Sequence, residues 1–84
     1  MNNLLEIKVC GINDELSMKT ALKYKADYIG FVFYPNSPRN ISINLSRELL
    51  QYRNKNTKIV ALTVNPNDDF LFEIKKKVKP DYIQ

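Results

Sequence analysis

One thiol and one guanidinium in this 84-residue sequence have surroundings that suit chemistry. Cys10 lies in KVCGIND, where Gly11 permits a tight turn just before a helix. The positive end of a helix dipole favours a thiolate, which can act as a base or a nucleophile. Arg39 lies in YPNSPRN, where Pro35 and Pro38 stiffen the chain around a guanidinium fork. Such a fork can hold a carboxylate or a phosphate.

Each of these residues also has a plainer interpretation. A lone cysteine at the end of a strand is often an inert core residue, and an isolated arginine is often only a surface residue. Asn65, in VNP, is a weaker candidate for a binding residue because Asn-Pro frequently begins a turn. The residues by themselves leave these alternatives open.

Apolar runs of strand type alternate with segments of helical spacing. The runs are Ile7 to Val9, residues 28–33, residues 58–64 and a fourth that begins in DYIQ at the end of the sequence. Between them, apolar stripes are formed by Met18, Ala21, Leu22 and Ala26, by Leu45, Leu49 and Tyr52, and by Phe70, Ile74 and Val78. The candidate helix caps are Asn13 or Asp14, Ser42 or Asn44, and Asn67 or Asp68.

This alternation predicts an α/β fold of parallel strands joined by right-handed crossovers. The nearly continuous apolar strands predict a sheet that is covered on both faces. Residues 1–84 are expected to form one domain, without a strong internal repeat. Because the carboxyl ends of parallel strands share one edge, Cys10, Arg39 and Asn65 should lie there together.

The composition argues against several classes of protein. No apolar run approaches the length of a membrane span, and no signal peptide is evident, so we expect a cytoplasmic protein. One cysteine and no histidine argue against a disulfide and against a zinc or other metal site. The net charge is +4, but the basic cluster KKKVK at 75–79 fits a solvated helix end better than a nucleic-acid surface, and no groove-reading motif is present.

Three stretches, IKVCGIN, ADYIGFVFYPNSPRNIS and VALTVNPN, carry a specific resemblance when taken in order. Together they resemble the N-terminal portion of the phosphoribosylanthranilate isomerase family, which are (β/α)8 barrels of tryptophan biosynthesis. The resemblance extends from Ile7 to Gln84 and implies about half a barrel: three βα units and a fourth strand. It also implies that Cys10 is the general base, that Arg39 binds the anthranilate carboxylate, and that no cofactor is needed.

The family's reaction is an Amadori rearrangement of phosphoribosylanthranilate, in which an acid protonates the ring oxygen while a base removes a proton from carbon. By the resemblance, the general acid and the phosphate-binding loops lie beyond Gln84. We therefore expect a truncated chain that is inactive alone and either needs a complementing C-terminal half barrel or self-associates. A non-catalytic remnant or interaction module is the alternative. The family usually has Thr at Asn13 and Gly at Lys25, so Lys25 is expected to adopt a left-handed conformation or to reshape its turn.

Overall fold

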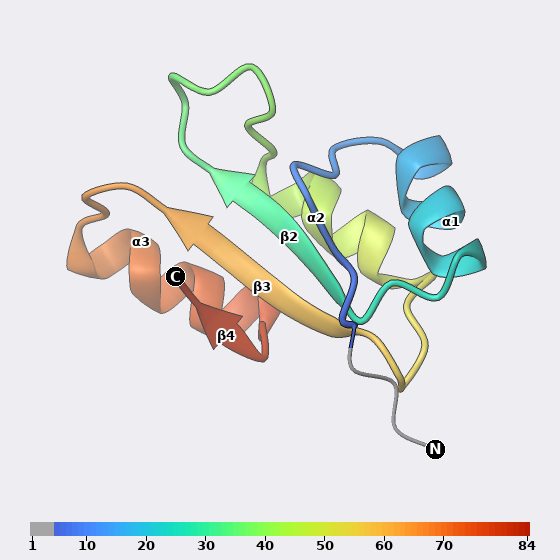
Figure 1. Cartoon of the computed structure of the whole chain (residues 1–84). Coiled ribbons are helices and arrows are strands. Elements are labelled where there is room, and N and C mark those ends of the chain that lie inside the picture. Colours follow the sequence, from blue (N-terminus) through green and yellow to red (C-terminus); the bar gives the residue numbers. More distant parts are fainter. Residues whose placement is uncertain (1–4) are drawn as a thin grey trace.

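Strands and helices alternate along residues 5–84, the part of the chain that this computed structural model describes (Figure 1). The strands are β1 (Lys8–Cys10), β2 (Tyr28–Phe33), β3 (Lys58–Thr63) and β4 (Tyr82–Ile83). The helices are α1 (Glu15–Lys23), α2 (Ile43–Leu50) and α3 (Asp68–Glu73), and a π-helical turn, η1 (Ile74–Val78), continues α3. All the strands are parallel and lie in the order β1-β2-β3-β4, which confirms the predicted fold.

Each α-helix begins at one of the capping residues expected from the sequence. The caps are Asp14, whose carboxylate accepts from the Ser17 N–H at 2.7 Å, Ser42, whose hydroxyl accepts from Leu45 N–H at 3.0 Å, and Asn67, whose amide oxygen accepts from Phe70 N–H at 2.8 Å. A side-chain oxygen at this position satisfies a backbone N–H that has no partner within the helix. The local sequence therefore determines where the helices begin.

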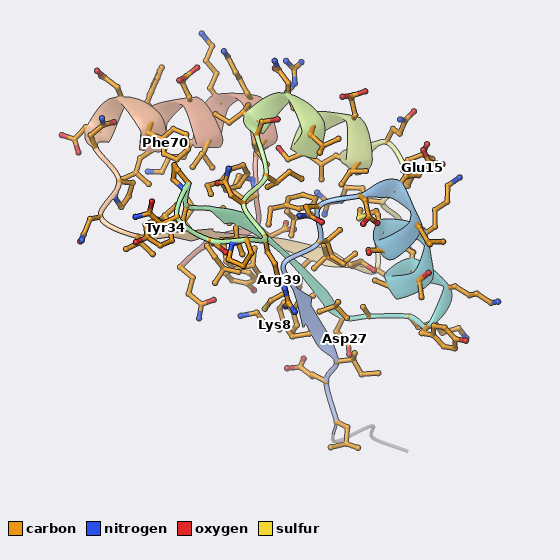
Figure 2. All side chains as sticks on the ribbon, turned by 90° about the horizontal axis from the view of Figure 1, so that it is seen from above. Lys8, Glu15, Asp27, Tyr34, Arg39 and Phe70 are labelled. Atoms are coloured by element: carbon orange, nitrogen blue, oxygen red, sulfur yellow. The ribbon has the colours of Figure 1, made fainter. Side chains whose placement is uncertain are left out.

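The core lies between the sheet and the helices, which gather on one face of it (Figure 2). The strands contribute Ile29, Phe31, Phe33, Ile59 and Ala61, and the helical segments contribute Met18, Ala21, Leu49, Ile74 and Val78, all of them buried. Alternate residues of a strand point to opposite faces, so only every second strand residue enters this core. Within residues 5–84 no helix is long and apolar enough to cross a membrane.

The opposite face of the sheet is concave and has no helix over it within residues 5–84, so the expectation of two covered faces is not met there. Tyr82 on this face is 50% exposed, whereas Val60, which lies deeper in it, is 4% exposed. Lys8 Nζ donates to Gln84 Oε1 at 2.8 Å, which joins the first strand to the residue that follows the last. Three strand spacings would separate flat edges by about 14 Å, so this contact requires a curved sheet.

The third helical segment departs from the α-helix that its stripe predicted. Phe70, Ile74 and Val78 recur every fourth residue, and η1 closes with a bond from Lys79 N–H to the Ile74 carbonyl at 3.1 Å. A π-helical turn is wider than an α-helical one. The wider turn compensates for the drift of a four-residue spacing around an α-helix, and both Ile74 and Val78 remain buried.

Lys25 has φ 59°, which is the left-handed conformation and the first of the two outcomes expected for this residue. Its N–H donates to the Leu22 carbonyl at 3.0 Å, and the next residue's N–H donates to the Ala21 carbonyl at 3.0 Å. These bonds end α1 as a left-handed C-terminal cap does. The turn is therefore not reshaped, and Lys25 bears the strain that a residue with a Cβ has in the left-handed conformation.

The amino ends of the strands are tied together by two equivalent aspartates. Asp27 accepts from Ile7 N–H at 2.8 Å and Asp81 accepts from Ile59 N–H at 2.7 Å, so each carboxylate reaches the preceding strand. Both aspartates begin the triplet Asp-Tyr-Ile, at 27–29 and 81–83. The sequence has no strong repeat, yet this short one performs the same task at the start of β2 and of β4.

Candidate active site at the carboxyl ends of the strands

The three candidate residues follow the carboxyl ends of three neighbouring strands. Cys10 is the last residue of β1, Arg39 lies in the loop after β2, and Asn65 lies just after β3. The loops after β2 and β3 extend past the arrowheads of their strands in Figure 1. Because the strands are parallel, all three residues lie at the edge where the sequence predicted them.

Cys10 is exposed, so the interpretation as an inert core cysteine is wrong. The reason is the alternation of the strand: Val9 packs against the core, and Cys10 therefore points to the concave face. Its Cα pairs with Gly30 of β2. The thiol is accessible on the face of the sheet that carries no helix.

The loop that carries Arg39 is held by its own hydrogen bonds. Ser37 Oγ accepts from Arg39 N–H at 3.1 Å, and Ile41 N–H donates to the Val32 carbonyl at 2.9 Å, which returns the loop to the end of β2. Ile41 is 3% exposed and anchors that return in the core. Arg39 itself is exposed and forms no ion pair within the described part of the chain. Figure 2 shows it over β1.

Cys10 and Arg39 meet at one cavity of about 640 Å³. Gly11 lines the cavity as well, and Leu16 of α1 and Tyr24, the residue that follows this helix, extend its wall. Both residues contribute to this hollow, which runs along the edge strand β1 on the side of α1. A thiol can accept a proton and a guanidinium can bind an anion, so two such neighbours suit a substrate with an acidic carbon and a carboxylate. Among residues 5–84 no three His, Cys, Asp or Glu side chains cluster closely enough to hold a metal ion.

Asn65 does not line this cavity. It is exposed, with φ 45°, between the end of β3 and the cap of α3. A left-handed asparagine before proline fits the plainer interpretation of Asn65 as a turn residue. The structure therefore brings together two of the three candidates and leaves the third at the same edge but outside their cavity.

A second cavity, of about 470 Å³, opens on the concave face, and the sequence reasoning missed it. It is lined by Lys8, Tyr28, Val60, Tyr82, Ile83 and Gln84. The Tyr28 hydroxyl donates to Glu6 Oε2 at 3.5 Å, and the negative charge of Glu6 is the largest of the effects that raise the pKa of Tyr28. The period of two along β1 could have revealed Lys8, because it shares the face of Cys10.

Parallel βα units with a candidate site at the carboxyl ends of their strands define the class of α/β enzymes that includes the (β/α)8 barrels. The sequence profile of the family described as N-(5'-phosphoribosyl)anthranilate (PRA) isomerase matches residues 7–84. The chain belongs to this family, as the resemblance of its motifs implied.

Curated relatives agree with this assignment. The chain is 42% identical over 79 residues to N-(5'-phosphoribosyl)anthranilate isomerase of Rhizobium rhizogenes, and 39% identical over 80 residues to that of Paramagnetospirillum magneticum. These matches cover 94% and 95% of this chain but only 36% and 37% of the relatives. The chain thus spans little more than a third of their length.

Solved structures show the same relation. Phosphoribosyl anthranilate isomerase from Thermotoga maritima superposes with a TM-score of 0.89 at 27% identity, covering 96% of this chain and 40% of that one. A second structure, of the isomerase in complex with reduced 1-(o-carboxyphenylamino)-1-deoxyribulose 5-phosphate, has a TM-score of 0.89 and is covered to 42%. The chain has the fold of these TIM-barrel proteins over about two fifths of their length.

Proposed function

We propose that residues 1–84 form the N-terminal half-barrel domain of a phosphoribosylanthranilate isomerase, which acts in the cytoplasm in tryptophan biosynthesis. The reaction converts phosphoribosylanthranilate to 1-(2-carboxyphenylamino)-1-deoxyribulose 5-phosphate. The observation that carries the proposal is the shared cavity of Cys10 and Arg39 in a chain whose family profile matches residues 7–84. The family's substrate has a carboxylate, which a guanidinium such as that of Arg39 can bind, and a carbon-bound proton, which a thiolate such as that of Cys10 can remove.

In this proposal Arg39 binds the carboxylate of the anthranilate ring, and Cys10 faces the sugar. A general acid protonates the furanose oxygen, which breaks the bond from that oxygen to C1 and leaves an iminium ion. The Cys10 thiolate then removes the proton from C2, and the electrons of that bond neutralise the iminium and give an enolamine. Protonation of C1 and loss of the proton from the C2 hydroxyl then give the aminoketose. No cofactor takes part, and Asn65 is at most a weak substrate contact.

The resemblance implies that the family's general acid and phosphate site lie outside residues 1–84, so we propose that these residues require a second half barrel. Exposed apolar side chains support this need. Leu16 is 76% exposed on α1, Phe72 is 65% exposed on α3, and Val64 is 51% exposed after β3. Large exposed apolar surfaces favour association, and strands at the two edges of an open sheet can pair with further strands. The partner is either a complementing C-terminal half barrel or a second copy of this chain.

The proposal is tested by complementation. The purified 84-residue chain is mixed with a polypeptide that carries the remaining strands of a relative such as the Rhizobium rhizogenes isomerase, and the loss of substrate fluorescence is followed. We expect turnover only in the mixture, with the Cys10→Ser chain as the control. Size-exclusion chromatography reports whether the two polypeptides associate.

Each other outcome of that experiment has a definite meaning. Stable association without turnover would favour the non-catalytic interaction module. A monodisperse chain that turns over substrate alone would overturn the need for a second half barrel. Association with turnover that survives Cys10→Ser would overturn the role of Cys10.

A further inference from the structure

Both glycines of this sequence lie at the candidate site, and a typical protein of this length contains about six. Gly11 has φ 79° and follows β1, whereas Gly30 lies inside β2. Elsewhere the chain adopts left-handed backbone without glycine, at Lys25, Asn65 and Lys79. A positive φ is therefore not a sufficient reason for glycine at position 11.

The side chain of Arg39 supplies the additional reason. A Cβ built on Gly11 would overlap Arg39 Cδ and would lie 3.3 Å from both Arg39 Cβ and Cγ. Gly11 N–H and Ile12 N–H donate to the same Gly30 carbonyl, at 3.0 and 3.2 Å, so the backbone cannot withdraw without losing both bonds. A side chain at position 11 would consequently displace the aliphatic part of Arg39.

Gly30 makes room for the thiol in a similar way. A Cβ built there would lie 2.9 Å from Leu62 Cδ1, 3.3 Å from Cys10 Sγ and 3.4 Å from Cys10 Cα. The carbonyl that fixes the turn at Gly11 belongs to this same residue. The two glycines are thus linked by hydrogen bonds, and each leaves space for one of the two candidate functional side chains.

We propose that Gly11 and Gly30 are positioning residues: Gly11 keeps the side chain of Arg39 beside the turn that follows Cys10, and Gly30 keeps the Cys10 thiol in place on the concave face of the sheet. The roles of base and carboxylate-binding residue rest on the proposed function. The steric arrangement does not, and it can be measured in the 84-residue chain without substrate. It predicts that Gly11→Ala acts on Arg39, and that Gly30→Ala acts on Cys10.

The test uses the single cysteine of the chain, which makes alkylation specific to Cys10. Rates are measured with iodoacetate, an anion, and with neutral iodoacetamide. A nearby guanidinium attracts the anion, so we expect the ratio of the two rates to fall several-fold in Arg39→Ala and to fall equally in Gly11→Ala. Added salt should reduce the wild-type ratio and leave that of both variants nearly unchanged. Gly30→Ala should change both rates by a similar factor and preserve the ratio.

Lys25→Ala is the matched control, because it places alanine at a left-handed position, φ 59°, on the other side of α1 from this turn. Because Lys25 already carries a Cβ in this conformation, the change should leave both the melting temperature and the ratio nearly unchanged. If Gly11→Ala retains the wild-type ratio, the proposal for Gly11 is wrong. If Gly30→Ala alters neither rate, the proposal for Gly30 is wrong.

A double variant covers the case in which Gly11→Ala folds poorly. If the overlap with Arg39 matters, Gly11→Ala should lower the melting temperature several degrees less in an Arg39→Ala background than in the wild type. Equal losses in the two backgrounds would overturn the proposal. A failed complementation assay alongside these alkylation results would refute the proposed function and leave the positioning role of the glycines intact.

Discussion

The two ends of the parallel strands use polar side chains in opposite ways. At the amino ends, Asp27 and Asp81 accept from backbone N–H groups of neighbouring strands, and Arg53 donates to both Asp81 and the Thr57 carbonyl, at 3.0 Å each. At the carboxyl ends, Cys10 and Arg39 are exposed and share a cavity. The polar side chains at the amino ends form hydrogen bonds within the protein, whereas those at the carboxyl ends are free to contact a ligand. Stability and chemistry are thus separated along the same strands.

Cys10→Ser should have the largest effect, and it should be confined to activity. In a complemented assembly we expect turnover to fall by roughly 10² to 10⁴-fold, the usual contribution of a general base. The free energy of unfolding should change by less than about 0.5 kcal/mol, because Cys10 is exposed. Steady-state kinetics and urea unfolding measure the two quantities. Substrate binding should remain largely intact, and activity within a few-fold of the wild type would remove Cys10 from the mechanism.

Asp81→Asn should have the converse effect, lowering stability while leaving turnover in the assembly nearly unchanged. The variant keeps an acceptor for Ile59 N–H but loses the charge that faces Arg53, 3.0 Å away. Because the Asp81 side chain is 37% exposed and solvent screens the pair, we expect a loss of about 1 kcal/mol. Glu48→Gln, at an exposed residue of α2 that forms no ion pair within residues 5–84, is the control and should be neutral.

The loss in Asp81→Asn should also depend on pH. The bond from Ile59 N–H, and then the Arg53 guanidinium, lower the pKa of Asp81 below its ordinary value of 3.8. A carboxyl whose pKa is lowered by folding contributes stability above the pKa of the unfolded chain, and that contribution disappears as pH falls through the folded value. The difference between wild type and variant should therefore be constant from about pH 5 to 8 and shrink below about pH 4. A difference that persists at pH 2 would show that the charge is not responsible.

Lys25→Gly should have the smallest effect. Lys25 lies in the turn after α1 and belongs neither to the hydrogen bonds at the amino ends of the strands nor to the candidate site at their carboxyl ends, so it shows what a local change of backbone alone does. Glycine adopts φ 59° without the penalty of a Cβ, so we expect a gain of up to about 1 kcal/mol. Lys23→Gly, within the last turn of α1, is the matched control and should instead cost about 1 kcal/mol. Thermal or urea unfolding measures both. A Lys25→Gly variant less stable than the wild type would show that the left-handed turn is not strained.

The sequence was most informative where the physical cause is local. Helix starts were predicted because a capping oxygen acts on N–H groups two or three residues away, as Asp14 does on Ser17. The left-handed conformation of Lys25 was one of two outcomes that the resemblance to a family motif left open. The residues alone left the exposure of Cys10 open, since a strand of three residues, Lys8–Cys10, gives too short a pattern to show which of its faces is the core face. Only the resemblance implied a thiol that faces a substrate.

What the sequence determined by itself is the order of the elements, the parallel sheet and the edge at which Cys10, Arg39 and Asn65 lie, because periodicity and connection rules act along the chain. Only the tertiary structure decided which of these residues meet. Arg39 and Gly11 are separated by 28 positions in the sequence. They come together because the loop after β2 is hydrogen-bonded back to the end of that strand, and because Gly11 has no side chain to exclude Arg39. Such contacts arise from packing between distant segments, and no local pattern specifies them.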